Sequence, residues 1–427
     1  MSRVHVIGAG LAGLSTALRL AERGIAVALY EAAPQAGGRC RSFYDERVDR
    51  VIDNGNHLML GANHAAFAYM KAIGGAAAVT EIAPAAFPFF DLANGERWTI
   101  RPNAGRIPWW MFAESRRVPG TRAWDYVSAL RLLHPKPTDT VADRLDPRAR
   151  LTAAFWEPLV VSVMNATLEE AAALPLAAVL HETFGRGEIA CRPWIALGGL
   201  SSALVEPAVA RLAQLGVVYH PSWRLMRIDR EIARVTALRF DAGTVELGPD
   251  ERSVLAVPAH AAAELLPGLR VPSGTRAIVN AHFRLPAPVR LPGGQHLLGL
   301  INGTVQWMVA RDDIVSITVS AADALADLPA EQLLPRLWRD VARVLALPAD
   351  AIPPARLIKE KRATFLQTPA NQKYRPTAVT AWQNLFLAGD WTDTGLPATI
   401  ESAVRSGVAA AAAVLRASPD LCKPMVS

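Results

Sequence analysis

Apolar and polar positions in the first thirty residues follow the order strand, turn, helix, strand. Val4–Ile7 is a short apolar run typical of a buried strand, and Leu11–Arg23 carries apolar residues at helical spacing. Gly24 stands where a helix commonly ends, and a second apolar run, Ile25–Tyr30, follows it. The pattern therefore predicts that the chain opens with a β-α-β unit.

A similar succession closes the chain, in the stretch NLFLAGDWTDTGLPATIESAVRSGVAAAAAVLRA. Leu385–Ala388 is an apolar run of strand length, and Gly389 and Asp390 follow it directly. A loop rich in Gly and Pro then leads to a helix that we expect to open near Thr399. Both ends of the chain therefore predict α/β structure.

The middle of the chain returns twice to this kind of pattern. One return has a Gly-Gly turn, Ser201 and Ser202 as expected helix caps, a helix to about Leu215, Gly216 as its stop, and then a strand. The other is the short apolar run RSVLAVPAH, residues 252–260, which a proline ends. We expect both returns to belong to the same layer as the chain ends.

Two long inserts between these returns predict antiparallel sheet. The stretch FPFFDLANGERWTI alternates around Asn94-Gly95, a dipeptide that favours a type I′ hairpin. Strands are expected at AIVNAHFRL and SITVSA, with the hairpin LLGLINGTVQWMVA between them. The inserts, residues 86–193 and 266–380, are therefore expected to form a second, α+β domain.

Composition narrows the class of protein. At 427 residues with 51% hydrophobic residues, the chain has material for two buried cores. Three widely spaced cysteines, Cys40, Cys191 and Cys422, suggest free thiols and neither disulfides nor a metal cluster. No secretory signal and no apolar run of about 20 residues is visible, so we expect a cytoplasmic location. A net charge of +6 without a reader motif gives no indication of nucleic-acid binding.

The opening turn carries a dinucleotide fingerprint. Gly8, Gly10 and Gly13 have the spacing G-x-G-x-x-G between the expected strand and helix. The first permits a tight turn, the second lets the backbone approach a pyrophosphate, and the third allows close packing of helix on strand. Glu31 ends the second strand, where a carboxylate accepts hydrogen bonds from a ribose diol.

The distant end of the chain favours FAD over NAD. Gly37, Gly38 and Arg39 provide a second glycine turn with a cation for the same pyrophosphate. Asp390 after its strand is placed to accept hydrogen bonds from a ribityl chain. Backbone N–H groups at Thr399 and Ile400 are expected to face the pyrimidine edge of a flavin. We expect the backbone of Leu225 to contact the adenine.

One insert is rich in tryptophan and arginine. Residues 97–124 hold six Arg and one Glu, a net charge of +5, together with four of the chain's 11 Trp. Either these rings form the core of the second domain, or Trp and Arg touch a membrane at the mouth of a lipid pocket.

Several motifs together resemble a known family. The opening GAGLAG, Glu31, GGR, DNGNHLMLG, RIPWW, PLVVSVMNATLEEA and GDWTDTGLPATIESAVRSG are similar to the squalene-associated FAD-dependent desaturases, in particular the hydroxysqualene dehydroxylases of bacterial hopanoid and squalene synthesis. The terminal motifs are shared with the wider amine oxidase and phytoene desaturase superfamily. Asn56 departs from the pattern, which commonly has Gln, and Ala166 stands where Thr is common.

The resemblance implies an α/β fold. It consists of a Rossmann-like FAD-binding domain of the glutathione-reductase and amine-oxidase type, interleaved with a substrate domain. We assign residues 1–85, 194–265 and 381–427 to the FAD-binding domain and the two inserts to the substrate domain. The segment from Asp53 to His57 would then lie beside the flavin, and the apolar residues that follow would enter the wall of the substrate pocket. The expected FAD-binding residues are Gly8, Gly10, Leu11, Ala12, Gly13, Glu31, Gly38, Arg39, Asn54, Gly55, Asn56, His57, Leu225, Gly389, Asp390, Pro397, Thr399 and Ile400.

The implied reaction is the reductive dehydroxylation of hydroxysqualene to squalene, an isoprenoid substrate. It needs a proton donor for the departing hydroxyl, and His57 is the first candidate because it titrates near neutrality. Asp393 is the second, and would need a pKa raised by burial. Expected substrate contacts are Leu58, Phe155, Trp156 and Asn165.

Alternatives and partners stay open at this point. A carotenoid or other isoprenoid desaturase, or another amine-oxidase-type oxidoreductase, would use the same parts, and a non-catalytic isoprenoid carrier would keep the fold without its flavin. Only one dinucleotide fingerprint is visible, so an external electron donor is expected.

Overall fold

A parallel five-stranded sheet forms the centre of one half of the molecule. The computed structural model describes residues 3–417. The strand order is β10-β2-β1-β14-β20, and every neighbouring pair is parallel. The strands are β1 (Arg3–Ile7), β2 (Ala26–Tyr30), β10 (Val218–His220), β14 (Arg252–Leu255) and β20 (Leu385–Leu387). Segments from both ends and the middle of the chain thus share one sheet.

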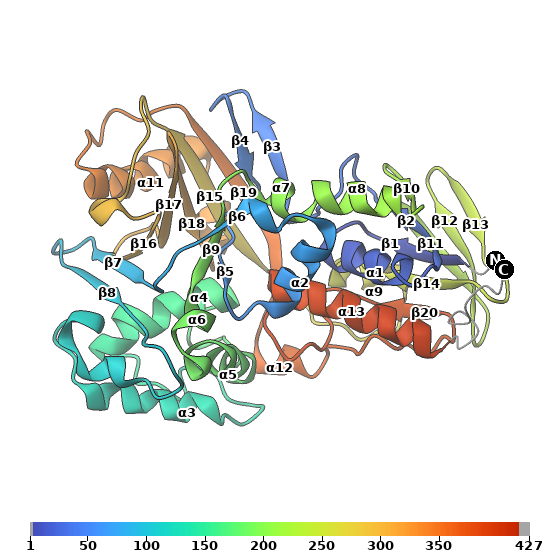
Figure 1. Ribbon diagram of the computed structural model, residues 1–427, viewed down its shortest axis with the longest axis horizontal. Helices are drawn as coiled ribbons and strands as arrows, with labels where there is room; N and C mark the ends of the chain where they lie inside the picture. Colours follow the sequence, from blue (N-terminus) through green and yellow to red (C-terminus); the bar gives the residue numbers. More distant parts are fainter. Residues whose placement is uncertain (1–2, 418–427) are drawn as a thin grey trace.

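Helices α1 (Leu11–Ala21) and α13 (Ile400–Arg416) lie side by side next to this sheet (Figure 1). Their approach depends on Gly407, because a Cβ atom there would lie 2.4 Å from the carbonyl oxygen of Ala12. The hydroxyl of Thr16 donates to the carbonyls of Ala12 and Gly407 across the contact. The first and last helices are therefore packed as one unit. The remaining elements of this half are α2 (His64–Ile73), α7 (Leu200–Leu204), α8 (Glu206–Gln214), α9 (Ala259–Leu265), β11 (Leu225–Arg230), β12 (Val235–Phe240) and β13 (Gly243–Glu246).

A seven-stranded sheet dominates the other half (Figure 1). Its order is β19-β15-β18-β17-β16-β7-β8, antiparallel throughout except between β16 and β7. Helix α11 (Ala330–Leu345) packs on it through a continuous apolar core that includes Phe283 and Trp338. The strands are β7 (Phe87–Asp91), β8 (Arg97–Ile100), β15 (Thr275–Arg284), β16 (Leu297–Ile301), β17 (Trp307–Arg311), β18 (Ile314–Val319) and β19 (Ala355–Phe365).

A helical lobe extends from β8 and packs beneath the seven-stranded sheet around its own apolar core. A π-helical turn, Thr152–Trp156, runs directly into α4; such turns occur often at functional sites. The lobe contains short 3-10 turns at Trp109–Phe112, Glu114–Arg116 and Ala123–Ala129, then α3 (Leu130–Leu133), α4 (Glu157–Met164), α5 (Ala173–Glu182) and α6 (Glu188–Cys191). Short strands join the halves, namely β3 (Ser42–Asp45), β4 (Arg50–Asp53), β5 (Met59–Leu60), β6 (Val79–Glu81) and β9 (Pro193–Ala196), while α10 (Asp323–Ala326) and α12 (Pro369–Gln372) lie in connecting loops.

The expected α/β class with an antiparallel sheet is confirmed, but two local predictions are wrong. Strands β7 and β8 form the hairpin at Asn94-Gly95, yet its turn is not type I′, because Gly95 has a positive φ and Asn94 does not. Ser201 and Ser202 do not cap a helix; they lie inside α7, whose cap is Gly199. The domain boundaries remain a prediction. Cys40 and Cys191 are buried free thiols, and Cys422 lies outside the described residues.

Candidate active site

The glycine turn between β1 and α1 leaves room in front of the helix. A Cβ atom on Gly8 would lie 2.5 Å from the oxygen of Ala256, and one on Gly13 would lie 1.8 Å from the oxygen of Gly8. A Cβ on Gly10 would meet no protein atom within 4 Å. No side chain caps α1, so the N–H groups of Leu11 and Ala12 open into this space. The turn fits a pyrophosphate.

Glu31 is fixed at the end of β2. Its carboxylate accepts hydrogen bonds from the backbone N–H groups of Ala9, at 2.7 Å, and Ala33, at 2.9 Å. Each carboxylate oxygen retains a lone pair for a ribose hydroxyl. Leu225 lies in the apolar cluster that also holds Tyr30, so the structure brings it to the same strand end as Glu31.

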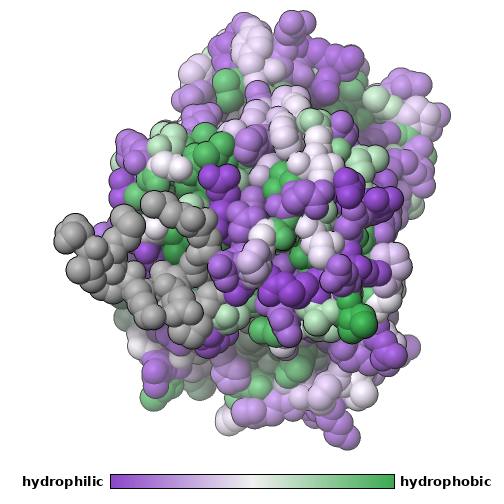
Figure 2. Space-filling model, turned by 90° about the vertical axis from the view of Figure 1, so that its right-hand side faces the viewer, coloured by the Kyte–Doolittle hydropathy of each residue, from purple (hydrophilic) through white to green (hydrophobic). Residues whose placement is uncertain are grey.

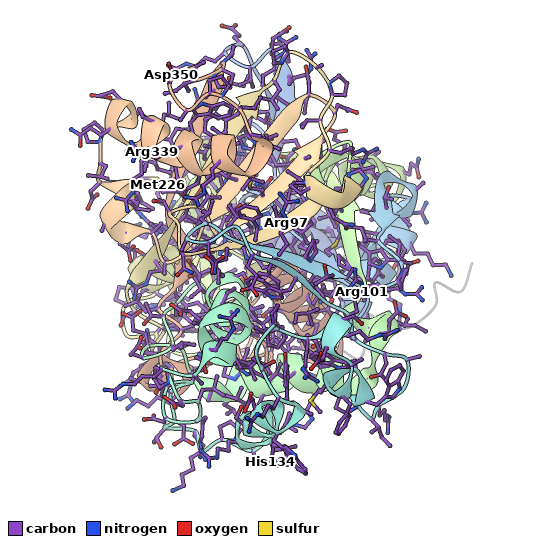
Figure 3. The ribbon with its side chains drawn as sticks, turned by 90° about the vertical axis from the view of Figure 1, so that its left-hand side faces the viewer. Arg97, Arg101, His134, Met226, Arg339 and Asp350 are labelled. Carbon is purple, nitrogen blue, oxygen red and sulfur yellow. The ribbon has the colours of Figure 1, made fainter. Side chains whose placement is uncertain are left out.

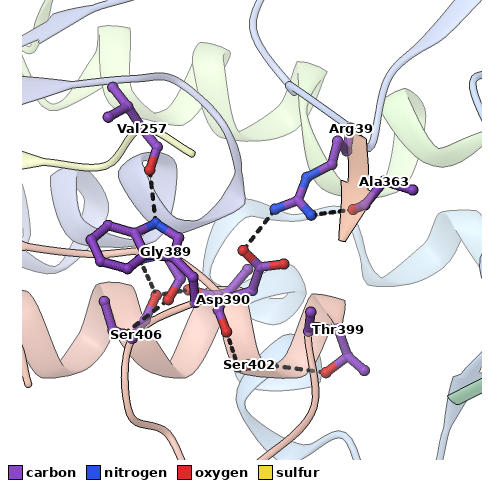
Figure 4. A network of polar contacts seen from close by, with 12 residues as sticks. Arg39, Val257, Ala363, Gly389, Asp390, Thr399, Ser402 and Ser406 are labelled. Atoms are coloured by element: carbon purple, nitrogen blue, oxygen red, sulfur yellow. Dashed lines mark hydrogen bonds and ion pairs between the residues drawn. The ribbon is translucent and has the colours of Figure 1, made fainter. Parts of the chain in front are cut away.

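Arg39 joins the two ends of the chain (Figure 4). Its guanidinium donates to Asp390 Oδ1 at 2.7 Å and to the Ala363 carbonyl at 2.6 Å. The neighbouring Asp390 carboxylate raises the pKa of Arg39, so the cation is permanent. On the other side, the N–H of Gly37 donates to the Ala9 carbonyl at 2.8 Å. The second glycine turn therefore lies on the first and reaches the strand-Gly-Asp segment, as FAD binding requires.

A cavity of about 290 Å³ borders the Arg39–Asp390 pair and is lined by His260, Thr275 and Arg362 among others. A larger cavity of about 370 Å³ lies between the segment that follows β15 and the end of α11, with Arg290 as its one charged residue. The smaller cavity adjoins the expected cofactor residues, and the larger does not. The paired charges thus face open space that a ligand can enter.

The loop after Asp390 is held by a buried arginine that sequence analysis missed. Arg375 donates to the carbonyls of Asp390, Thr392 and Leu396 at 2.6–3.1 Å. Burial lowers the pKa of Arg375, although Asp390 and Asp393 oppose the effect. Its sequence context, KYRP, has no distinctive spacing. The contacts appear only when the loop is folded over it.

The N-terminus of α13 lies at the end of this loop. Thr399 is its cap, and its hydroxyl accepts the N–H of Ser402 at 3.2 Å (Figure 4). Ser402 in turn donates to the carbonyl of Asp390 at 3.3 Å, and Gly389 donates to Ser406. Pro397 precedes the cap, and Ile400 begins the helix. The N–H of Ile400 and the positive helix end are available to an electron-rich ring edge.

The polar segment after β4 is attached to the seven-stranded sheet. The side-chain amide of Asn54 donates to Glu360 at 3.3 Å, and that of Asn56 donates to Thr318 at 3.2 Å. A Cβ atom on Gly55 would lie 3.1 Å from the side chain of Asn280, so glycine allows this approach. These amides position the segment through protein contacts, which the sequence did not indicate.

His57 is half-buried, and its Nδ1 lies 3.0 Å from the carbonyl of Gly55. Because a carbonyl only accepts, Nδ1 carries the proton, and in the neutral ring Nε2 is an acceptor. Burial lowers the pKa of His57 and outweighs the bond to Gly55. His57 therefore donates from Nε2 only when the ring is charged. The other candidate acid, Asp393, has an exposed side chain and lacks the burial that this role requires.

The four expected substrate residues differ in burial and in hydrogen bonding. Phe155 and Trp156 are buried in the core of the helical lobe, 4.7 Å apart between ring centroids. Leu58 is 37% exposed and follows His57. The amide of Asn165, by contrast, donates to Arg276 and Thr364 and accepts from Ala321, so all of its main hydrogen-bonding capacity is used within the protein.

Unpaired indole N–H groups mark the aromatic core. Among the described residues, the buried Nε1 atoms of Trp98, Trp156 and Trp307 have no hydrogen-bond partner. Trp307 pairs across the strands with Thr318, the residue that holds Asn56. The aromatic core thus adjoins the polar segment.

Comparisons with known proteins agree with this geometry. A family model described as flavin containing amine oxidoreductase matches residues 11–415. A hydroxysqualene dehydroxylase of Rhodopseudomonas palustris is 46% identical over 97% of this chain and 98% of its own. One of Sinorhizobium fredii is 42% identical over 96% and 97%. The chain belongs to the flavin-containing amine oxidoreductases, in the hydroxysqualene dehydroxylase family.

Solved structures show the same fold for this family member. Cyclohexylamine oxidase from Brevibacterium oxydans superimposes with a TM-score of 0.71 at 17% identity, covering 97% of this chain and 99% of its own. The protein is an FAD-dependent oxidoreductase. The glycine turns, Glu31, the Arg39–Asp390 pair and the start of α13 fit that cofactor.

Proposed function

We propose that the protein removes the hydroxyl group of hydroxysqualene reductively, which gives squalene. The observation that carries this proposal is the near full-length similarity to two hydroxysqualene dehydroxylases. The site supports it, because a polar segment ending at His57 continues into Leu58, Met59 and Leu60 and adjoins an aromatic core. A hydrocarbon with one polar group matches such a boundary.

The reaction requires a proton donor, and groups that stabilise a cation, from the residues of the protein. Hydroxide is a poor leaving group, so a proton must reach the substrate oxygen for it to depart as water. The allylic cation left behind is stabilised by aromatic faces by about 0.5–2 kcal/mol each, a task for rings such as Phe155 and Trp156. Reduced FAD supplies the hydride that completes the new C–H bond. We assign the proton to His57, in its charged form.

An anaerobic single-turnover experiment tests the proposal. When reduced protein is mixed with hydroxysqualene, squalene is expected to form while the absorbance of oxidised flavin returns. A desaturase would leave hydroxysqualene unchanged and would reduce oxidised flavin with a saturated isoprenoid. A colourless protein that fails to bind added FAD would support the carrier instead. Absence of squalene from a sample in which every protein molecule carries FAD would overturn the assignment.

Partners and location follow from the substrate. We propose an external electron donor, because the described residues show one dinucleotide fingerprint. We also propose a cytoplasmic protein that meets its substrate on the inner face of the membrane, through the region from Trp98 to Trp124. Residues 3–417 contain no helix with the length and apolarity needed to cross a bilayer. Contact with lipid would therefore be peripheral.

A further inference from the structure

The tryptophan-rich insert divides into an inner and an outer set of rings. Trp98 and Trp110 are buried, whereas Trp109 is 50% and Trp124 is 78% exposed. The outer rings lie among other exposed apolar side chains on two turns that contact each other. We call this group the tryptophan surface; it consists of Ile107 (78% exposed), Trp109, Phe112 (68%), Trp124, Val127 (43%) and Leu130 (61%).

Hydrogen bonds and ring packing beneath the two turns fix their backbone, which keeps these side chains on the surface. Buried Asn103 donates to the Ile107 carbonyl at 3.0 Å and accepts the N–H of Trp110 at 3.0 Å. Trp110 packs edge-on against buried Tyr126 from the second turn, 5.2 Å between centroids. With Trp110 fixed inward, its neighbour Trp109 points outward. An exposed group of this size commonly marks an interaction site.

Positive charge surrounds the tryptophan surface. Residues 101–131 contain six arginines and two acidic residues, a net charge of +4. Arg101, Arg106, Arg122 and Arg131 are exposed, and the guanidinium of Arg116 lies 4.9 Å from the Trp109 ring centre. Figure 3 shows Arg101 on the edge of this lobe. The opposite end of the molecule is mostly hydrophilic, with apolar residues in small separate groups (Figure 2).

Helix α6 connects the tryptophan surface to the candidate active site. Gly187 lies against Gly105, and the N–H of Glu188 donates to the carbonyl of Asn103 at 2.9 Å. On its other side, Gly61 lies against the carbonyl of Ile189, whose side chain is 66% exposed. Helix α6 and its exposed Ile189 thus lie between the segment that carries the tryptophan surface and the segment that follows Leu58.

We propose that the tryptophan surface docks the protein on a bilayer that contains anionic lipids, with its apolar side chains below the headgroups and its arginines among the phosphates. Amphipathic rings and arginine are the residues suited to this interface. A face-to-face contact with a second copy is disfavoured, because it would bring two surfaces of charge +4 together. The proposal rests on the proposed function for its purpose, since the hydrocarbon substrate resides in lipid.

Vesicle flotation tests the proposal without substrate or turnover. Flavin-loaded protein is mixed with vesicles of phosphatidylcholine alone or with added phosphatidylglycerol, and the partition coefficient is measured. We expect the partition coefficient of the variant Trp109→Ser/Trp124→Ser to fall at least about tenfold on both vesicle types. The partition coefficient of Arg101→Gln/Arg122→Gln should fall roughly 25-fold on anionic vesicles and little on neutral ones, since each arginine near the headgroups is worth about fivefold.

Matched variants control for general effects of exposed residues. Ile232→Ser/Met226→Ser removes side chains that are 103% and 60% exposed on the β11–β12 hairpin, and should float like wild type. Arg23→Gln/Arg270→Gln is the control for charge. Flavin absorbance and melting temperature confirm that each variant is folded.

Three results would overturn the docking proposal. The first is wild-type protein that stays unbound with both vesicle types, and the second is a double Trp variant that floats as well as wild type. The third is a dimer in sedimentation that the Trp substitutions dissociate, without flotation of either protein, which would assign the surface to a second copy. Protein that floats but makes no squalene would instead contradict the proposed function.

Discussion

Asp53 and Arg311 form a buried ion pair, 2.8 Å between Oδ2 and Nη1, with side chains only 5% and 9% exposed. Asp53 ends β4, beside the polar segment that follows it, and Arg311 ends β17 of the seven-stranded sheet. The second carboxylate oxygen accepts from the Ser42 hydroxyl at 2.6 Å and the N–H of Leu200 at 2.8 Å. One carboxylate thus joins the polar segment to both halves of the molecule.

Replacing Asp53 by Ala is expected to destabilise the protein by about 3–5 kcal/mol, because it leaves the Arg311 charge buried and unpaired. The matched control is Asp327→Ala, which breaks the pair with Lys361, where the side chains are 77% and 63% exposed. This change should have little effect on the free energy of unfolding, because water screens an exposed pair. Urea unfolding of the flavin-loaded proteins measures both. Equal effects of the two substitutions would contradict the role of the buried pair.

His282 makes stability depend on pH. Its ring is fully buried in β15, and burial lowers its pKa to about 4. Below about pH 6.5 the unfolded chain gains a proton that the folded chain does not, so stability falls as the pH falls from about 6.5 to about 4. The loss attributable to this group is about 3 kcal/mol. His282→Gln should remove that part of the slope in unfolding free energy against pH. A variant with the wild-type slope would show that other groups account for it.

Two glycines of the fingerprint should respond differently to alanine. Gly10→Ala adds a methyl group that meets no protein atom within 4 Å, so the apoprotein should unfold at nearly the wild-type temperature. FAD affinity should fall at least about tenfold, because the methyl group enters the pyrophosphate space. Gly13→Ala brings a Cβ to 1.8 Å from a backbone oxygen and should destabilise even the apoprotein. Titration of apoprotein with FAD, with thermal unfolding beside it, separates the two. Unchanged FAD affinity in Gly10→Ala would argue against phosphate binding there.

Local patterns predicted the elements of this fold well where one sequence signal determines one element. Gly8, Gly10 and Gly13 between two apolar runs predicted a tight turn from strand to helix, because few other local structures suit that spacing of glycines. Ser201 is an instructive failure, because the same residue type that caps helices here accepts the N–H of distant Ser42. Contacts such as Arg375 with the loop after Asp390, or Asn165 with Thr364, join segments far apart in sequence. Neither the apolar periodicity nor the spacing of motifs in the sequence predicts those contacts.

Arg375 should be required for flavin retention although we assign it no contact with substrate. Arg375→Met leaves the buried carbonyls of Thr392 and Leu396 without this donor, and leaves that of Asp390 with only the Ser402 hydroxyl, at a cost of at least about 2 kcal/mol. The loop would loosen, and the ratio of flavin to protein absorbance should fall after gel filtration. Arg23→Met, at an exposed position, is the control. Full flavin content in Arg375→Met would show that the loop holds its shape without this arginine.

The proton donor is identified by the pH dependence of the reaction. Because Nδ1 of His57 is committed to the Gly55 carbonyl, only the charged ring donates from Nε2, and its pKa is lowered by burial. The kcat/KM for hydroxysqualene should therefore rise as the pH falls below about 6.5 and through the pKa that His57 has in the folded protein. His57→Gln should lower kcat by about 10²–10³-fold and should lack this acidic limb. Asp393→Asn, at an exposed carboxylate, should keep both the rate and the limb. If the limb survives in His57→Gln and disappears in Asp393→Asn, the loop carboxylate is the donor and must become buried when substrate binds.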